Sequence, residues 1–559
     1  MQHYHSSKLI RRYIGEMPLL KAAATRLGFR DLLARYLPLH GNEKIATVDS
    51  LMLMVYNIAC GRQPMYELEH WATKLGPRVI PGNGAGHHLF NDDRCGRALD
   101  KLYLSDMASL TTETGLQTVR IERIELDRMH NDSTSVKAYG RIPGTTRTGF
   151  FLAKGHSKDH RPDLKQLIYS LTISADGAVP VHYKAYPGNR TDDKTHIQTW
   201  TTLCAIAGRS DFLYVADCKV CTDPQLHHIV AHGGRVVTIM PETWKESVLF
   251  KNQLRRHAKA KRPILRQQVE SHETTIETFS SFTGRQYTKK RGYRLYWIHS
   301  TEKCVRDRQA RENALRKLEQ QLAEFNGKLN RHKLKKRSQI SIRLQNILAA
   351  NEASRFIQVS IAQTTSVHRV QKRRGRPGPQ TAFSVRTRRL FILHWNRDVV
   401  ALRRELRVDG IFPLLSTDET ISAKEALQAY KYQPRLEKRF SQYKDVLLAA
   451  PLLFKKIERV EAITYLYFLA LILQAVIERN IRQRMKEKEI AALPIYPEQR
   501  LAHHPTTAKI VAFFKDISAY TIIRKGKPKD AYRDDITPLH KKVLSLLGIK
   551  QKNYWNPGY

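Results

Sequence analysis

The stretch from residue 119 to residue 240 constrains the fold most narrowly, because it reads as a series of strands. Apolar and polar residues alternate from Val119 to Asp132, as a half-buried strand requires. Apolar runs at 166–174 and 179–186 then flank Asp176-Gly177, a dipeptide that favours a tight hairpin turn. We therefore expect three consecutive antiparallel strands, the first ending at Asp132.

The pattern then changes to an alternation of strands and helices. A helix is expected at 192–207, a fully buried strand in DFLYVAD up to Asp217, a second helix at 223–231 and a strand at 235–240. Three antiparallel strands followed by this alternation is the order of a ribonuclease-H-like core. We predict an α/β fold in which flanking helices cover a ribonuclease-H-like mixed sheet.

The length of 559 residues is too great for one core, so several domains are expected. Inside a basic, Pro- and Gly-punctuated stretch we expect a polar helix at 307–329, a basic loop at 372–379 and strand-like alternation at 388–407. We predict a helical N-terminal domain at 1–115, the first part of the core at 116–242, a large α+β insertion at 243–416, the second part of the core at 417–488 and a basic tail at 489–559.

The charge of the chain indicates a polyanionic partner. Ninety-five Lys and Arg against 52 Asp and Glu give a formal net charge of +43, which favours nucleic acid over an anionic membrane surface or ribosomal packing. Six Cys are too few for a disulfide framework, and the first residues lack the apolar core of an export signal, so a cytoplasmic location is expected. The apolar run at 462–477 is too short to span a bilayer and predicts a buried core helix rather than a membrane segment.

Three acids are candidate metal ligands. Asp132 and Asp217 end neighbouring strands, and Glu437 lies in the basic segment YKYQPRLEKRFSQYK at 430–444. Carboxylate oxygens suit two Mg²⁺ or Mn²⁺ ions, which activate a water or hydroxyl and stabilise a departing oxygen in phosphoryl transfer. Each acid also has a purely structural interpretation, as a strand-end or helix-cap aspartate or as part of a solvated helix. Asp127 is a second choice, because an alternating strand places it on the opposite face from Asp132.

Helical geometry gives the segment around Glu437 a functional face. Offsets of three, four and seven residues would align Tyr430, Gln433, Glu437 and Lys444 along one side of a single helix. Weaker signals receive a structural interpretation: Cys218 and Cys221 have no second pair at zinc-ribbon spacing, and the histidines near residue 230 are typical of a helix. The charged loop at 158–161 is favoured as a DNA contact.

Several motifs carry a family resemblance. NDSTS around Asp132, GHSKDHRPDLKQL from Gly155, PGNRTDD from Pro187, VAD ending at Asp217 and the E-x6-K of Glu437 and Lys444 resemble the DDE transposases of bacterial insertion sequences. The more specific resemblance, over roughly residues 17–485, is to the group with a split ribonuclease-H-like domain and a Y-x2-R-x3-E-x6-K signature.

The resemblance implies a cut-and-paste enzyme. Two Mg²⁺ or Mn²⁺ ions would support cleavage at element ends, and the freed 3′ hydroxyl would then attack target DNA. The expected partners are element-end and target DNA, held by a homodimer or higher multimer in the bacterial cytoplasm near the nucleoid. Independently of the resemblance, we expect end recognition in residues 1–115 and in the insertion, because both lie outside the catalytic core.

The family roles transfer to individual positions. Asp132, Asp217 and Glu437 match the acidic triad, and the resemblance gives the two other signature positions, Tyr430 and Lys444, a role in steadying DNA phosphates.

One signature position differs. Gln433 stands where the signature has Arg, and a neutral amide cannot make the same phosphate contact, so Arg435 is the candidate replacement. Two alternatives stay open: an inactive, transposase-derived DNA-binding protein, and a ribonuclease-H-like nuclease without strand transfer.

Overall fold

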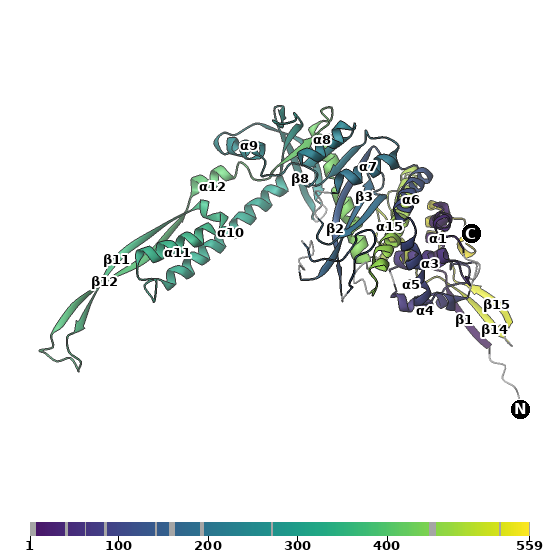
Figure 1. Ribbon diagram of the computed structural model, residues 1–559, viewed down its shortest axis with the longest axis horizontal. Coiled ribbons are helices and arrows are strands. Elements are labelled where there is room, and N and C mark those ends of the chain that lie inside the picture. Colours follow the sequence, from purple (N-terminus) through teal and green to yellow (C-terminus); the bar gives the residue numbers. More distant parts are fainter. Residues whose placement is uncertain are drawn as a thin grey trace. The chain divides into compact units, whose positions relative to one another are not determined.

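The protein forms two compact units in a computed structural model (Figure 1). The first contains residues 1–238 and 426–559, and the second contains residues 239–425, where the insertion was expected at 243–416. The structure describes residues 7–39, 43–61, 63–82, 86–139, 142–155, 163–190, 195–269, 272–446, 454–524 and 527–557.

A mixed sheet organises the first unit, as the α/β prediction requires. Within the unit, its strands lie in the order β4-β3-β2-β5-β6, with β2, β3 and β4 antiparallel and β5 and β6 parallel to β2. These strands and the helices that connect them are β2 (Arg128–Ala138), β3 (Lys165–Ser174), β4 (Pro180–Pro187), α7 (His196–Ala207), β5 (Leu213–Ala216), α8 (Asp223–Ala231) and β6 (Arg235–Ile239). The predicted hairpin turn joins β3 to β4, where Gly177 and Ala178 both have positive φ, at 76° and 54°.

The strand predicted from Val119 to Asp132 is wrong at both ends. Helix α6 (Met107–Glu122) continues through Val119 and ends where Arg123 adopts a left-handed φ of 50°. Strand β2 begins at Arg128 and continues to Ala138, so Asp132 lies in mid-strand. The residues of α6 that face inward recur at helical spacing, and VRIE extends that helix as readily as it begins a strand. The expected domain boundary at 115/116 therefore falls inside a helix.

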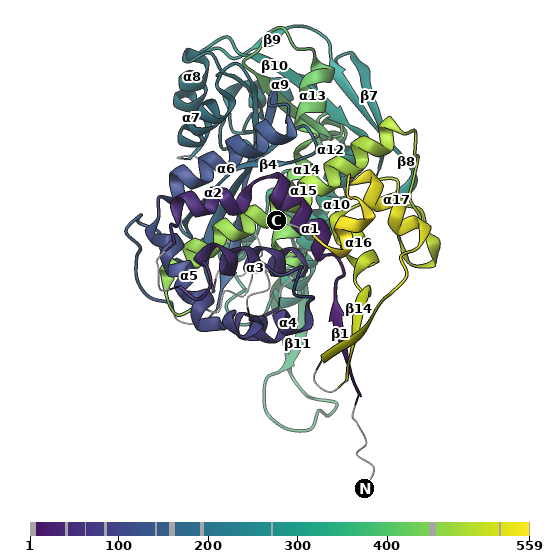
Figure 2. The ribbon, with the colours of Figure 1, turned by 90° about the vertical axis from the view of Figure 1, so that its right-hand side faces the viewer.

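A long buried helix, α15 (Ile457–Glu487), forms the core of the first unit. It is long and apolar enough to cross a membrane by length and composition, but 94% of its most apolar window is buried within the protein, so the predicted core helix is confirmed. Figure 2 shows the surrounding helices, and those that pack on it are α1 (Met17–Arg26), α3 (Thr47–Ala59), α5 (Asp92–Leu104), α16 (Thr507–Phe514) and α17 (Pro538–Leu546).

The two ends of the chain meet in a small sheet. Strand β1 (Ser7–Tyr13) pairs antiparallel with β14 (Ser518–Arg524), which pairs with β15 (Lys527–Arg533). The shorter elements of this unit are α2 (Phe29–Tyr36), η1 (Met65–Glu67), α4 (Leu68–Lys74), η2 (His87–Leu89), η6 (Pro497–Gln499) and α18 (Gln551–Trp555).

The second unit combines an antiparallel sheet, a helical hairpin and a long ribbon. Its sheet has the order β13-β10-β8-β7, with β9 beside β10. In chain order the elements are α9 (Lys245–Arg256), β7 (Lys261–Val269), β8 (His272–Phe282), β9 (Gln286–Tyr287), β10 (Arg294–Ser300), α10 (Thr301–Lys328), α11 (Arg337–Ala349), η4 (Glu352–Phe356), β11 (Ile357–Gln371), β12 (Phe383–Arg397), α12 (Val399–Glu405) and β13 (Ile411–Ser416). The helix predicted at 307–329 is confirmed by α10, whereas the alternation predicted at 388–407 is correct only as far as Arg397, because α12 follows.

Candidate active site

The parallel pairing of β2 with β5 brings Asp132 next to Asp217. The register aligns Asn131 with Ala216, so the next residue on each chain segment is an aspartate. Neighbouring strands lie about 4.8 Å apart, and residues at one level of a parallel pair point to the same face. The two carboxylates therefore share one face of the sheet, at the point where β5 ends.

Local hydrogen bonds orient both aspartates. Asp132 Oδ1 accepts a hydrogen bond from the Ser133 amide at 2.7 Å, and Asp217 Oδ1 accepts one from the Lys219 amide at 3.0 Å. The Asp217 carbonyl accepts a further bond from the Thr238 hydroxyl at 2.7 Å. The two amide bonds orient the carboxylates, and the Thr238 bond holds the backbone of Asp217.

The junction between two helices covers the Asp132 face of the sheet. Alternation along β2 places His130 on the same face as Asp132. The His130 ring packs 4.8 Å from the ring of Tyr432, and the Gln433 amide donates a 3.3 Å hydrogen bond to the Asn131 carbonyl. Helix α14 (Gln433–Ser441) therefore begins directly over the residues that precede Asp132.

A second aromatic contact fixes the other end of this helix. Tyr169 on β3 lies opposite Thr134 in the register, so it shares the Asp132 face. Its ring stacks at 4.3 Å on that of Tyr443, in the π-helical turn η5 (Gln442–Val446). Glu437 lies between Tyr432 and Tyr443 in the chain, so the helix that carries it crosses the face that carries Asp132.

The charges of all three acids act on the phenol of Tyr430. Burial raises the pKa of Tyr430, and the negative charges of Asp217, Asp132 and Glu437 raise it further, with a contribution from the Cys218 thiol. The three carboxylates therefore act on one hydroxyl group, which stays protonated at neutral pH and can donate a hydrogen bond.

A buried ion pair anchors the helix that bears Glu437. The Arg439 guanidinium donates to Glu478 on α15 at 2.9 Å, and each side chain is only 4% exposed. The same guanidinium donates to the carbonyl of Ala178 at 2.9 Å and to that of Gly177 at 3.2 Å, in the β3–β4 turn. Helix α14 is thus tied to both the sheet and the core helix.

The single helix predicted over 430–444 is wrong. Helix α13 (Ala423–Tyr430) ends before Lys431, and α14 starts afresh at Gln433, because Pro434 has no amide hydrogen and suits the first turn of a new helix. The break separates Tyr430 from Glu437. Lys444 lies outside α14, in the half-buried π-helical turn.

The residues expected to bind phosphate occupy different environments. Gln433 is buried at 7% exposure and bonded to β2, so its amide does not face solvent. Arg435 is exposed, and its charge acts on Tyr432, Arg482 and His504. The charged loop at 158–161, favoured above as a DNA contact, lies outside the described residues.

Two of the three acids fit a shared divalent cation. Asp132 and Asp217 supply hard oxygen donors at one level of the sheet, as Mg²⁺ and Mn²⁺ require. In the part of the chain that the structure describes, no group of three or more His, Cys, Asp or Glu is close enough to hold one ion. Glu437 is therefore not grouped with the two aspartates among these residues, and it is exposed on α14.

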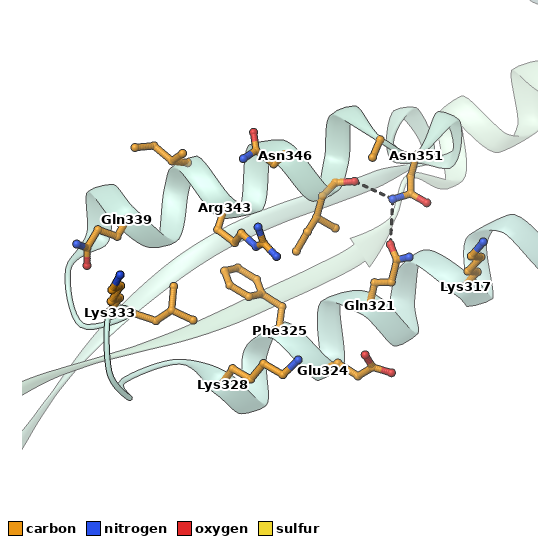
Figure 3. Close-up of a pocket in the computed structure, with 14 residues that line it drawn as sticks. Lys317, Gln321, Glu324, Phe325, Lys328, Lys333, Gln339, Arg343, Asn346 and Asn351 are labelled. Atoms are coloured by element: carbon orange, nitrogen blue, oxygen red, sulfur yellow. Dashed lines mark hydrogen bonds between the residues drawn. The ribbon is translucent and has the colours of Figure 1, made fainter.

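A large hollow lies elsewhere, in the second unit. Figure 3 shows this hollow between α10 and α11. Its volume is about 950 Å³, and four of its lining residues are cationic: Lys317, Lys328, Lys333 and Arg343. Glu324 is the one acid among its lining residues, so the hollow offers no paired carboxylates. It does not compete with the β2–β5 edge as a centre for metal chemistry.

The residues that position the site were not predicted from the sequence. His130, Tyr432, Arg439 and Glu478 hold α14 against the sheet and α15. A signal for one of them was present, because Glu478 is an acid directly after the apolar run at 462–477 and must be paired if that helix is buried.

Comparison with known proteins gives two similarities. Residues 10–116 match a family model described as "Domain of unknown function (DUF4277)". No curated protein matches the chain. Among solved structures, the chain is similar to the piggyBac transposase in a synaptic complex with hairpin DNA, with 8% identity and a TM-score of 0.36 over 84% of this chain and 76% of that chain. A similarity at this level carries no argument about mechanism.

Proposed function

We propose that the chain is a DDE transposase with a ribonuclease-H-like catalytic core. It cleaves DNA at the ends of a mobile element and joins the freed 3′ ends to target DNA, using two Mg²⁺ or Mn²⁺ ions. Element-end and target DNA are its partners, and a homodimer or higher multimer in the bacterial cytoplasm is the acting species. The net charge of +43 supports a polyanionic substrate.

One observation carries this proposal: the β2–β5 register that sets Asp132 beside Asp217 under the helix of Glu437. The order β4-β3-β2-β5-β6 supports the ribonuclease-H-like assignment, because three antiparallel strands are extended by two parallel ones. The two aspartates come from strands 85 residues apart in sequence, at positions 132 and 217, and the fold brings them to one level.

The side chains divide the work as follows. Asp132 and Asp217 would hold the cations, and Glu437 would complete the ligand set once cation and DNA are bound. Bound cations supply activation of the attacking water or 3′ hydroxyl and stabilisation of the leaving oxygen. The protonated Tyr430 phenol donates a hydrogen bond to a phosphate oxygen, and Lys444 contributes positive charge beside the cut.

Gln433 has a different role from the Arg of the signature. Its amide is bonded to the Asn131 carbonyl, one residue before Asp132, so it sets the distance between α14 and β2. The exposed guanidinium of Arg435 on the same helix would contact DNA further from the cut.

A cleavage assay tests the proposal. Purified protein is incubated with Mg²⁺ and a plasmid that carries the genomic flanks of the gene with their inverted repeats. Wild-type protein should nick at the repeats, and Asp132→Asn, Asp217→Asn and Glu437→Gln should each lower the rate at least about a hundredfold while DNA binding persists. A second reaction with pre-cut ends measures joining.

Asp127→Asn is the matched control, because this aspartate lies at the start of the same strand region with a 78% exposed side chain. It should cleave at the wild-type rate. Full cleavage by all three triad variants would reject the assignment of the acids. Cleavage without joining would indicate a nuclease, and binding without cleavage by the wild type would indicate an inactive descendant.

A further inference from the structure

The ribbon of the second unit is a basic arm. Its two strands, β11 and β12, pair over 15 residues each, a length of about 50 Å at 3.3 Å per residue. Figure 1 shows the pair running beyond the ends of α10 and α11. Between residues 366 and 389 the sequence holds eight Lys and Arg and no Asp or Glu.

The root of the arm is packed and its acids are paired. Phe391 and Leu393 are buried against the leucines of α10, and the Arg397 guanidinium bonds to both Glu312 and Glu319 at 2.8–3.1 Å. Farther out, the Arg388 guanidinium donates to the Asn330 carbonyl, in the connection between α10 and α11, at 2.6 Å.

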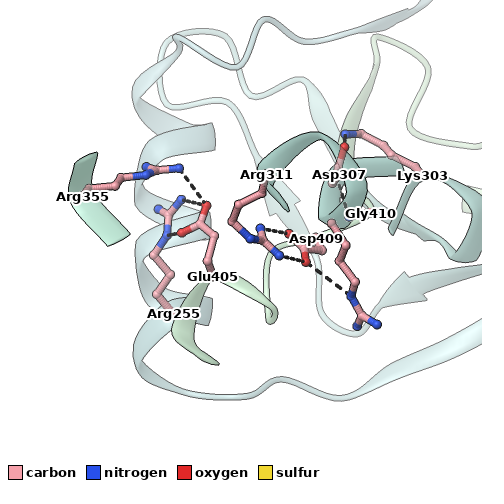
Figure 4. Close-up of polar contacts among 9 residues, drawn as sticks. Arg255, Lys303, Asp307, Arg311, Arg355, Glu405, Asp409 and Gly410 are labelled. Carbon is pink, nitrogen blue, oxygen red and sulfur yellow. Dashed lines mark hydrogen bonds and ion pairs between the residues drawn. The ribbon is translucent and has the colours of Figure 1, made fainter. Parts of the chain in front are cut away.

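Further ion pairs hold the root to the rest of the unit (Figure 4). Arg311 on α10 makes two 2.7 Å bonds to Asp409, whose side chain is 3% exposed. Glu405 on α12 accepts from Arg255 on α9 at 2.8 and 3.0 Å and from Arg355 at 3.2 Å. These acids near the root are thus paired within the unit, and the outer half of the arm, which has no Asp or Glu, is positive.

The tip of the arm is the segment KRRGRPGP, from Lys372 to Pro379, and all its residues are exposed. A bond from the Lys372 amide to the Ala382 carbonyl, at 2.9 Å, closes the hairpin. Gly375 has φ of +146°, a conformation that favours glycine, and no atom lies within 4 Å of where its Cβ would be. Arg374 and Arg376 therefore flank a glycine that has no side chain and has open space beside its Cα.

We propose that this tip is a minor-groove element for A·T-rich duplex DNA, with Arg374 and Arg376 entering the groove. The narrow minor groove of A·T tracts concentrates negative potential that attracts arginine, whereas the N2 amino group of guanine obstructs its floor. Gly375 lets the backbone approach the groove between the two guanidinium groups. The remaining cations of the arm lie on both faces of the ribbon, where they meet the phosphates on either side.

The inference rests on the proposed function in taking DNA as the partner. The arm would then bind A·T-rich DNA beside the element ends or at the target. A two-stranded ribbon also fits the major groove, so the experiment distinguishes the two grooves.

The test measures binding of the full-length protein to three labelled duplexes by fluorescence anisotropy. One duplex is an A·T tract, one is G·C, and one is the G·C sequence with inosine in place of guanine. Inosine removes the minor-groove amino group and leaves the major-groove pattern of guanine. The A·T and inosine duplexes should bind about tenfold more tightly than the G·C duplex.

Two double variants locate this preference. R374A/R376A should bind all three duplexes with equal affinity, whereas the matched control K372A/R373A, which removes the same charge from the same tip, should weaken all three and keep the preference. The salt slope of the control should fall by about 1.8, as expected for two lost phosphate contacts.

Tight binding of A·T but not inosine duplex, or a preference retained in R374A/R376A, would overturn the assignment of the tip. Equal binding of all three duplexes by the wild type would also overturn the assignment of the tip, but it would not contradict the proposed function. If the wild type binds none of them at low salt, the DNA premise of the proposed function fails as well.

Discussion

Replacement of Arg439 by Met should loosen the helix that carries Glu437. The side chain is buried and makes four hydrogen bonds: to Glu478, to Gln442 at 2.6 Å, and to the two carbonyls of the β3–β4 turn. The substitution leaves the Glu478 carboxylate buried without its main counter-charge. Removal of one partner of a buried ion pair costs about 3–5 kcal/mol.

The lower end of that range applies here. Glu478 keeps hydrogen bonds from Gln442 at 3.1 Å and from the Thr507 amide at 3.0 Å, and Arg482 lies 3.7 Å away. We therefore expect the free energy of opening of α14 to fall by about 3 kcal/mol, which increases the open population about a hundredfold.

Amide hydrogen exchange measures this opening directly, through peptides that cover 433–441. R439M should exchange about a hundredfold faster there than the wild type, and R439M/E478L should recover much of the protection because no unpaired charge remains. R35M is the control, because the Arg35–Glu113 pair spans 2.9 Å at 61% and 41% exposure and contributes at most about 1 kcal/mol. Unchanged exchange of α14 in R439M would refute the anchoring role.

Two further predictions concern stability. Burial, and then the charge of Lys184, lowers the pKa of His182 from 6.5 to about 4. Between pH 6.5 and 4, His182 is therefore protonated in the unfolded chain but neutral in the folded chain. Its contribution to the free energy of unfolding is complete above pH 6.5 and declines by about 1.4 kcal/mol per pH unit as pH falls toward 4. The unfolding midpoint should fall less steeply over that range in H182Q, and an identical pH profile would contradict the argument. A methyl group at Gly115 in α6 would collide with the Val181 carbonyl, whereas nothing lies within 4 Å of one at Gly327 in α10. G115A should therefore lower the melting temperature. G327A should keep or raise it, because Ala stabilises a helix by up to about 1 kcal/mol relative to Gly. An unchanged melting temperature in G115A would contradict the close packing of α6 on β4.

The sequence predicted correctly those elements whose ends are set by nearby turn residues and short apolar runs. The turn at Asp176-Gly177, the helix at 223–231 and the buried strand before Asp217 are all present, because turn residues and short apolar runs fix them. The segment VRIE was misassigned, since its spacing suits a strand and a helix equally. The break before Gln433 was missed although Pro434 signals a new helix start.

Less of the candidate site than of the fold could be predicted from the sequence. Asp132 and Asp217 could be named from their motifs, but their adjacency depends on a parallel pairing between distant strands. The contacts of Tyr432 with His130 and of Arg439 with Ala178 join segments more than 250 residues apart, and no local pattern encodes them. For the same reason, the position of Glu437 above the sheet had to come from the fold.

The most direct test of the central claim is the number of Mn²⁺ ions that the protein binds, measured by electron paramagnetic resonance in a titration of wild type, D132N, D217N and the control D127N. We predict that wild type and D127N share a bound-ion signal that D132N and D217N each lose. An equal number of bound ions in all four proteins would show that the paired aspartates of β2 and β5 do not hold the metal.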